Sequence, residues 1–221
     1  MLGIAAPPVL AEGSAITLSL SDASQVRPRN VTVEAVRYGG SEALEVRQTG
    51  PYRGFDTDTF AFVPGLDFHD GTIELDVAGS LLPSAPPDAR GFIGITFRID
   101  AESGGFASEG FYIRPTNGRA DDQVRRNHST QYSAHPSFDF SVSRKEAPER
   151  YESYVDLEPG VWTRYRITVE GTKARLYVHG SAQPALIVND LKLGDSFGAV
   201  ALWIGPGTEG YFTGLEITAQ R

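Results

Sequence analysis

The sequence predicts an all-β protein, built as a sandwich of two antiparallel sheets. Apolar and polar residues alternate with a period of two from residue 16 to residue 217, and no window of about a dozen residues carries the apolar stripe of an amphipathic helix. Clusters of Gly, Pro, Asn and Asp divide the alternating runs at intervals of about 8 to 12 residues, as in sandwiches and barrels. Short strands joined by turns are therefore expected along nearly the whole chain.

Strands are expected wherever an alternating run lies between turn residues. The run 71–78 is followed by the proline-rich segment 81–90, which is interpreted as a loop rather than a domain linker because the alternation resumes after it. Gly171 and Thr172 predict a tight hairpin between two strong runs. The polar segment 138–150 is expected to form either a long surface loop or one short helical turn. In chain order, the predicted strands are 15–20, 31–37, 43–47, 59–63, 71–78, 91–99, 110–114, 151–155, 161–169, 173–179, 185–188, 197–204 and 210–218.

Alternation also assigns the two faces of the central strands, because successive side chains of a strand point to opposite sides of the sheet. One set is apolar and is predicted to form the core: Ile73, Leu75, Val77, Ile93, Ile95, Phe97, Ile99, Phe111 and Ile113. The opposite set is polar and is predicted to collect on one open face if the strands are neighbours: Glu74, Asp76, Arg98, Tyr112 and Arg114.

Composition narrows the class of protein. The chain has 221 residues, and residues 12–221 are expected to form a single domain with one large core. It contains no cysteine, which excludes disulfides, thiolate zinc sites and thiol nucleophiles. The net charge of −8 disfavours nucleic acid and anionic membrane surfaces as partners. No apolar run approaches the roughly 20 residues that span a bilayer, so no membrane span is expected.

The N-terminal residues 1–11 are apolar and rich in small side chains. Val9, Leu10 and Ala11 before Glu12 fit the pattern of a signal-peptidase site. No Lys or Arg precedes this run and two prolines interrupt it, which is equally typical of a disordered arm. The segment is interpreted as a signal-peptide remnant or an arm, and a secreted or periplasmic location is favoured.

Several strand-like segments together resemble a known superfamily. The succession FHDGTIELDV, ARGFIGITFRI, EGFYIRP, GVW leading into RYRITVEGTKARLYVHG, then GAVALWIG and YFTGLEI resembles the concanavalin A-like lectin/glucanase superfamily. More narrowly, it is similar to the laminin G-like and 3-keto-disaccharide hydrolase-like jelly rolls of bacteria. The resemblance covers about residues 60–218. It implies a jelly roll of two antiparallel sheets whose concave sheet or rim loops meet carbohydrate.

The resemblance also allows one catalytic mechanism to be tested on the residues. Retaining glucanases of the superfamily carry their nucleophile and acid/base in a Glu-x-Asp-x-(x)-Glu pattern, with the carboxylates about 5 Å apart. Glu74 and Asp76 match its beginning, but Gly79 and Ser80 stand where the second glutamate belongs. That mechanism is therefore rejected, and Glu74 and Asp76 are interpreted as a binding or a structural pair.

The segment 110–132 is the best candidate for a ligand site. It concentrates planar arginine donors, amides and aromatic rings, which are the groups that recognise sugar hydroxyls and ring faces. The candidate ligand-binding residues, with one from the segment that follows, are Tyr112, Arg114, Asn117, Arg126, Asn127, Gln131, Tyr132 and Tyr151. The alternative is that Arg114 pairs with Glu152 or Asp121 and only anchors the loop.

Catalytic and metal sites have weaker support. His128 or His135 is a candidate general acid/base, with Asp122 or Glu152 as its partner, because imidazole titrates near neutral pH. No histidine has a second histidine at metal-ligand spacing, so zinc is not expected. Asp67 and Asp70 offer oxygen ligands for a structural calcium ion, although an ordinary Asp-Gly turn has the same sequence.

Three functions follow from these observations. The leading hypothesis is a lectin-like domain that holds an oligo- or polysaccharide on the concave sheet and the 115–132 loop. The alternative is a sugar-active hydrolase or lyase that resembles the 3-keto-glycoside hydrolases. The third is a protein-interaction domain, which ranks last because the outward-facing residues are polar. The sequence leaves the oligomeric state open.

Overall fold

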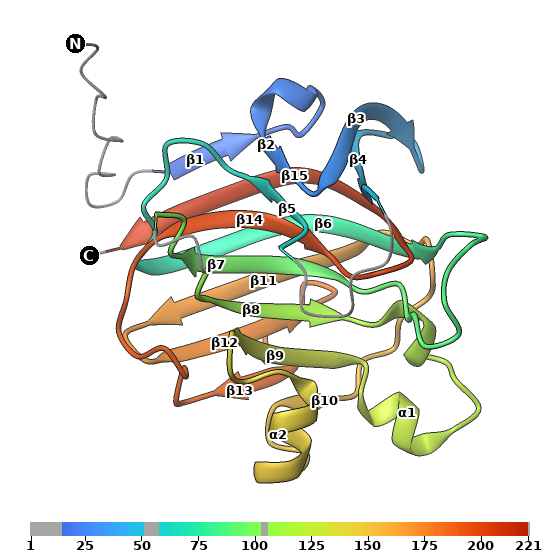
Figure 1. Ribbon diagram of the computed structural model, residues 1–221, viewed down its shortest axis with the longest axis vertical. Helices are drawn as coiled ribbons and strands as arrows, with labels where there is room; N and C mark the ends of the chain where they lie inside the picture. The colour runs from blue at the N-terminus through green and yellow to red at the C-terminus, as the bar shows by residue number, and fades with distance from the viewer. Residues whose placement is uncertain (1–14, 51–57, 103–105, 221) are drawn as a thin grey trace.

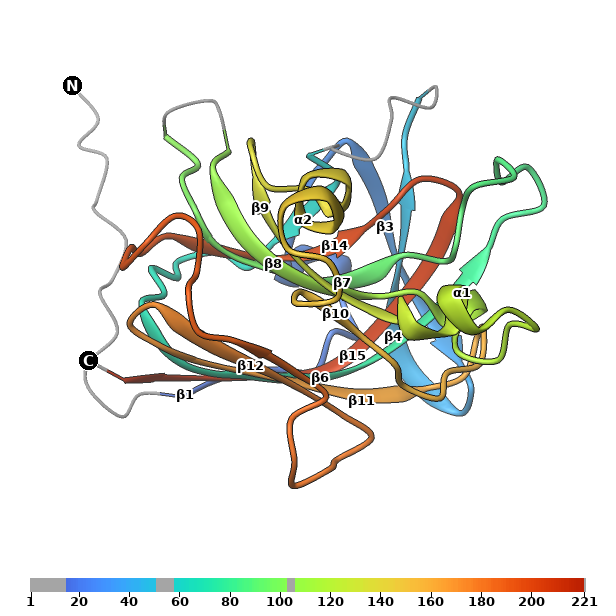
Figure 2. The same cartoon turned by 90° about the horizontal axis from the view of Figure 1, so that it is seen from below.

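The computed structural model describes residues 15–50, 58–102 and 106–220, so the N-terminal segment 1–11 lies outside the described residues. Two antiparallel sheets face each other (Figures 1 and 2), as the sequence predicts. One sheet has the order β13 (Leu186–Val188), β12 (Lys173–Val178), β11 (Thr163–Glu170), β6 (Asp70–Leu81), β15 (Thr208–Gln220), β4 (Ser41–Gln48) and β3 (Val31–Tyr38), with β1 (Ala15–Leu18) also paired to β15. The other has the order β10 (Glu152–Ser153), β9 (Thr130–His135), β8 (Ser108–Ile113), β7 (Ile93–Ile99), β14 (Ala199–Ile204), β5 (Phe60–Phe62) and β2 (Arg27–Arg29).

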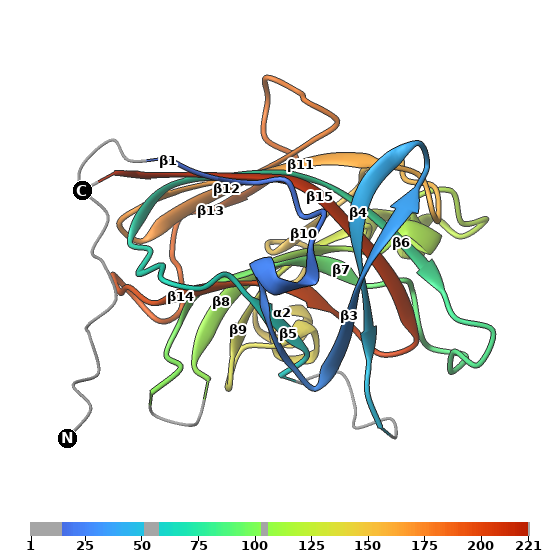
Figure 3. The same cartoon turned by 90° about the horizontal axis from the view of Figure 1, so that it is seen from above.

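The core lies between the two sheets. The predicted inward residues Ile73, Leu75 and Val77 of β6 are fully buried, and they belong to the same cluster as Ile93 and Ile95 of β7. Burying each such side chain contributes about 1.5–3 kcal/mol. Figure 3 shows β3 and β4 crossing one side of the sandwich from the eight-stranded sheet toward β2 and β5 of the other.

The predicted hairpin at Gly171 is confirmed. Glu170 of β11 pairs with Lys173 of β12, and Gly171 has a φ of +54°, a left-handed conformation that glycine adopts at little cost. This hairpin fixes the register of β11, which in turn pairs with β6 along Gly71 to Val77. Local turn chemistry thus sets the β11–β12 hairpin, while the pairing of β11 with β6 joins segments that are distant in the sequence.

The predicted position of Arg98 on an open sheet face is wrong. Arg98 has a φ of +52°, and the β7–β14 register shifts between Ala199 and Ala201, so the chain bulges there. A one-residue bulge exchanges the two faces of the strand beyond it. The Arg98 side chain is fully buried and pairs with Asp70, and Ile99 joins a second apolar cluster instead of the main core.

The predicted open face does not form either, because its residues belong to different sheets. Glu74 and Asp76 lie on β6 of the eight-stranded sheet, and Tyr112 lies on β8 of the seven-stranded sheet. Arg164 of β11 binds Glu74 at 2.8 Å and Asp76 at 3.3 Å. The structure thus supports the interpretation of Glu74 and Asp76 as a structural pair.

The segment expected to be a loop over residues 115–132 contains regular structure. It forms the 3-10 turn η2 (Pro115–Asn117), the helix α1 (Gln123–Asn127) and the first part of β9, which pairs with β8. Another 3-10 turn, η1 (Ala23–Gln25), precedes β2. No helix among the described residues is long and apolar enough to cross a membrane.

The segment 138–150 contains the helix α2 (Phe140–Glu146), which is longer than the single turn expected. The Asp139 carboxylate caps it by accepting hydrogen bonds from the backbone N–H groups of Ser141 and Val142, at 2.7 and 2.9 Å. In Figure 2, α2 lies on the face of the seven-stranded sheet that points away from the core. This outer face is where the candidate site lies.

Candidate functional site

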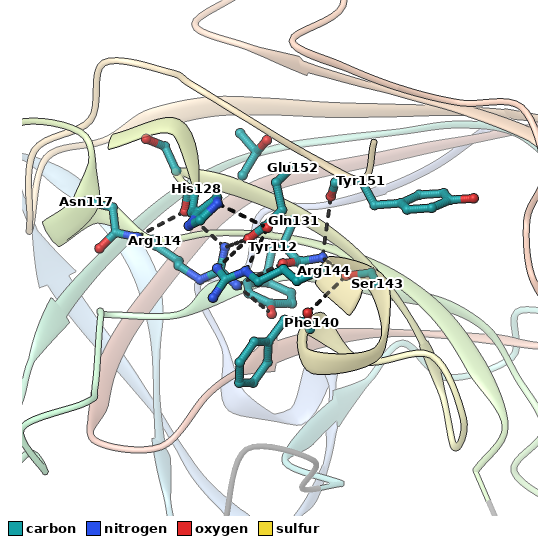
Figure 4. A network of polar contacts seen from close by, with 12 residues as sticks. Tyr112, Arg114, Asn117, His128, Gln131, Phe140, Ser143, Arg144, Tyr151 and Glu152 are labelled. Carbon is teal, nitrogen blue, oxygen red and sulfur yellow. Dashed lines mark hydrogen bonds and ion pairs between the residues drawn. The ribbon is translucent and has the colours of Figure 1, made fainter. Parts of the chain in front are cut away.

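A buried ion network joins β8, β10 and α2. The carboxylate of Glu152 accepts hydrogen bonds from Arg114 Nη1 at 3.1 Å and from Arg144, Nε at 2.8 Å and Nη2 at 2.6 Å (Figure 4). The Glu152 side chain is only 3% exposed, and a buried charge without such partners is strongly destabilising. The alternative in which Arg114 pairs with Glu152 is therefore confirmed, and the partner is not Asp121.

Arg114 also binds neutral groups from three neighbouring segments. Its Nη1 donates to the carbonyl of His128 at 2.9 Å, and its Nη2 donates to Tyr112 Oη at 3.1 Å and to Gln131 Oε1 at 2.9 Å. The amide of Asn117 donates to the same His128 carbonyl at 3.0 Å. The buried guanidinium thus holds the end of β8, the start of β9 and the turn before α1 in one arrangement.

A cavity of about 440 Å³ lies beside this network, between the outer face of the seven-stranded sheet and the two helices. Its charged lining residues are Asp88, Arg90, Arg114, Asp122, Arg125 and Arg144. The remaining lining residues are Phe92, Asn117, Val124, His128 and Phe140. Apolar walls with a few fixed polar groups are typical of small-molecule sites.

Two of the lining arginines make no ion pair within the described part of the chain. Arg125 donates to Asn117 Oδ1 at 2.9 Å and to Thr116 Oγ1 at 3.1 Å, and Arg90 donates to the carbonyls of Pro87 and Ala89. Burial lowers the pKa of Arg90, and the positive charge of Arg125 lowers it further. Arginine side chains carry a positive charge in proteins, so both guanidiniums can donate charge-assisted hydrogen bonds.

His128 is held in its neutral form at pH 7. Burial lowers its pKa, the charges of Arg144 and Arg114 lower it further, and Glu152 opposes the shift. The Nε2 atom of His128 lies 3.5 Å from a carboxylate oxygen of Glu152, and the side chain is 19% exposed. A neutral imidazole at the cavity wall can donate or accept a hydrogen bond or a proton.

The structure brings together part of the predicted site. Tyr112, Arg114, Asn117, Gln131, His128 and Glu152 belong to the network, and Asp122 lines the cavity while its carboxylate caps α1. Arg126 and Asn127 are on α1 but instead bind Tyr154 and Gln123. His135 stands at the far end of β9, opposite Ser108, roughly 16 Å along the strand from Thr130.

Two predicted aromatic residues are in the core instead. Tyr132 is fully buried between the sheets, where its hydroxyl donates to Glu109 and accepts from the backbone N–H of Lys192. Tyr151 is equally buried and donates to Asp190 at 2.7 Å. Neither ring is available to stack on a ligand in this arrangement, so their predicted ligand-binding role is not supported.

Sequence reasoning missed several lining residues, most of them outside the segment 110–132. Arg90 ends the proline-rich loop, Arg125 is on α1, and Phe140 and Arg144 are on α2. A helix signal was present, because Asp122 and Asp139 each stand directly before a helix as an N-cap. That signal predicts where the two helices begin in the sequence, but not where they pack on the sheet.

The loop that carries the predicted calcium ligands is organised by an arginine. His69, Asp70 and Asp195 offer ligand atoms within 4.8 Å of one another, and Asp67 is not in this group. Arg98 Nη2 lies 2.9 Å from Asp70 and 3.6 Å from Asp195. A guanidinium thus already balances these carboxylates, and the arrangement favours the ordinary turn over the calcium site considered at Asp67 and Asp70.

Comparison with known proteins identifies the fold. No protein-family model matches the sequence, and no curated protein is significantly similar to it. A Bacillus subtilis protein of unknown function with a galectin-like fold superposes with a TM-score of 0.61 at 10% identity, over 96% of this chain and 99% of that chain.

Two further solved structures are similar over most of their length. A Parabacteroides distasonis protein provisionally named a glycosyl hydrolase gives a TM-score of 0.53 at 10% identity, over 93% of this chain and 94% of that chain. A carbohydrate-binding module from Bacillus subtilis gives a TM-score of 0.49 at 13% identity, over 89% of this chain and 92% of that chain. Together with the strand topology, the galectin-like Bacillus subtilis protein and the Parabacteroides distasonis protein show that this chain has the jelly-roll sandwich fold of the concanavalin A-like lectins and glucanases.

Proposed function

We propose that the protein binds a carbohydrate in the cavity on the outer face of the seven-stranded sheet. The observation that carries this proposal is the cavity itself, about 440 Å³ in volume, with arginine, amide, histidine and phenylalanine side chains around it. Sugar rings present hydroxyls at their edge and C–H groups on their faces. A wall that combines fixed hydrogen-bond donors with aromatic rings matches both.

The lining is rigid before any ligand arrives, which favours binding. Arg114 is held by Glu152, Tyr112 and Gln131, and Arg125 is held by Asn117. Because these side chains are already ordered, a ligand does not have to immobilise them on binding. The similar Parabacteroides distasonis protein, provisionally named a glycosyl hydrolase, also supports a role that involves carbohydrate.

A second candidate function is catalysis on a sugar, and one observation favours it. His128 lines the cavity in its neutral form and faces Glu152. Glu152 itself is bound by Arg114 and Arg144, so it serves as their counter-ion and is poorly placed to exchange a proton with a ligand. Binding without turnover is therefore the first proposal, and product analysis on any bound sugar tests the second.

The location of the cavity is tested by filling it. Val124 lines it and is 67% exposed, so Val124→Trp adds a bulky ring at the cavity without disturbing the core. Val161, 50% exposed before β11, gives the matched control Val161→Trp. On an array of neutral and acidic glycans, Val124→Trp is expected to abolish binding that Val161→Trp retains. Binding that survives Val124→Trp, or no binding by the folded wild type, would rule out the proposal.

Export of the protein, expected from residues 1–11, remains a proposal. Expression of the full chain in a bacterium, followed by fractionation and mass measurement of the N-terminus, tests it. A processed protein in the periplasm or medium supports export, and an intact N-terminus inside the cell contradicts it.

A further inference from the structure

The cavity carries an excess of positive charge in a chain whose net charge is −8. Arg90, Arg114, Arg125 and Arg144 line it. Glu152 offsets Arg114 and Arg144 through its three charge-assisted hydrogen bonds. Asp88 and Asp122 also line the cavity, but neither forms an ion pair with Arg90 or Arg125.

Among the four arginines that line the cavity, Arg90 and Arg125 are therefore the two that form no ion pair with a described carboxylate. Each is half-buried, so water screens its charge only in part. Burial lowers the pKa of Arg90, the like charges of Arg125 and Arg114 lower it further, and the charge of Asp88 offsets these like charges only in part. Holding like charges together in a partly desolvated wall is unfavourable, and a bound anion would relieve that repulsion.

We propose that the bound sugar carries an anionic substituent, a carboxylate or a sulfate ester, placed against Arg90 and Arg125. This inference rests on the proposed function, because it specifies the ligand of the same cavity. A guanidinium presents a planar fork of N–H donors that matches a carboxylate or sulfate with two parallel hydrogen bonds. Phe92 and Phe140 line the same cavity and offer apolar surface to the sugar ring.

The charge of the ligand is tested by calorimetric titration with matched oligosaccharides. The probes are oligogalacturonates, oligoglucuronates and oligomannuronates, each beside its carboxyl-reduced neutral form, and sulfated oligosaccharides of the same length. We expect the charged forms to bind about 10- to 100-fold more tightly than the neutral forms, as a charge-assisted hydrogen-bond pair implies. Their affinity should fall as salt is added, because ions screen the attraction.

The roles of Arg90 and Arg125 are tested with the variants Arg125→Gln and Arg90→Gln, and the folding of each variant is checked by circular dichroism. Each substitution is expected to lower the affinity for the charged probe about 10- to 100-fold. Either substitution removes repulsion from the empty cavity, but Arg125→Gln also removes the hydrogen bonds to Asn117 and Thr116, so the melting temperature of each variant is measured before its affinity. Val161→Trp is the control that retains binding. The two arginine variants act on different segments, so a folding defect in one leaves the other informative.

The outcomes separate this inference from the proposed function. If the neutral forms bind as tightly as the charged ones and Val124→Trp abolishes both, the cavity binds sugar but its preference for anions is refuted. If charged probes bind the wild type and both arginine variants bind them as tightly as the wild type does, the assignment of the anion site to Arg90 and Arg125 is refuted. If no glycan of either kind binds, the proposed function and this inference fail together.

Discussion

Arg144 on α2 binds Glu152 on β10 through two parallel hydrogen bonds of 2.8 and 2.6 Å, and this contact fastens the helix to the seven-stranded sheet. Glu152 is also bound by Arg114 from β8. One carboxylate therefore connects three elements that are separated in the sequence. The wall of the cavity depends on that connection, because both arginines line it.

Replacing the carboxylate of Glu152 should be costly. Glu152→Gln leaves Arg114, which is almost fully buried, without its ionic partner, and breaking a buried pair in this way costs about 3–5 kcal/mol. Urea unfolding of the variant measures the loss. Glu42→Gln is the matched control, since its pair with Arg37 is exposed and such pairs contribute little. Equal losses in the two variants would show that the Glu152 network does not stabilise the fold.

Stability should decrease in mild acid because of His128. Its pKa in the folded protein is lowered by burial and by Arg144 and Arg114, while Glu152 and Glu149 oppose the shift. When the pH falls below about 6.5, the unfolded chain takes up the proton first, so the free energy of unfolding falls. The decrease ends below the lowered pKa of the folded state.

The His128 contribution is measured by urea unfolding between neutral and mildly acidic pH. His128→Gln should show a flatter dependence than the wild type in the window below about pH 6.5. The backbone carbonyl that accepts from Arg114 and Asn117 is kept in this variant. The same dependence in both proteins would contradict the assignment.

Tyr132 should act on stability through Glu109. Burial raises the pKa of Glu109, and the hydrogen bond from Tyr132 works against that shift by favouring the carboxylate. Tyr132→Phe removes this bond and also the acceptor of the Lys192 backbone N–H, so we expect a loss of about 1–3 kcal/mol. Thermal unfolding measures it. Tyr177→Phe on β12 should change little, because the Tyr177 hydroxyl makes no hydrogen bond within the described ranges.

Calcium should not change the stability of the protein. Arg98 already balances Asp70 and Asp195, so chelation with EDTA, or addition of millimolar calcium, is expected to leave the melting temperature constant. A ligand that binds only the folded state stabilises it by RT ln(1 + c/Kd) at a free ligand concentration c, so the melting temperature rises with the ligand concentration. A rise with calcium would therefore mean that a cation site exists after all.

Strand alternation predicted the centre of the eight-stranded sheet because β6 and β11 follow it closely, although their pairing joins segments that are distant in the sequence. It failed for β9, where Thr130, Gln131 and Tyr132 are all buried, because α2 packs on the outer face of this strand and β10 pairs along its edge. The residues from Gln131 to His135 do alternate, but this run is short and follows a segment dense in arginines and amides. Its polar residues were accordingly interpreted as a loop.

The sequence also predicted only part of the candidate site, because some of its residues are brought in by tertiary packing. The concentration of arginines and amides in 110–132 identified Arg114, Asn117 and Gln131, and Glu152 was named as a partner. Arg90 and Arg144 reach the cavity from outside this segment, through the packing of a loop and a helix on the sheet. Such contacts depend on the tertiary fold, and no local pattern of residues encodes them.

The helix α2 contributes Phe140 and Arg144 to the cavity, so the cavity exists only while the helix is docked. Local opening of α2 and loss of the ligand site are then the same equilibrium. A ligand that occupies the cavity must slow the exchange of the α2 amide hydrogens with solvent, even though it contacts only a few of the side chains of the helix. The short helix on the sheet would thus act as the reporter of whether the site is filled.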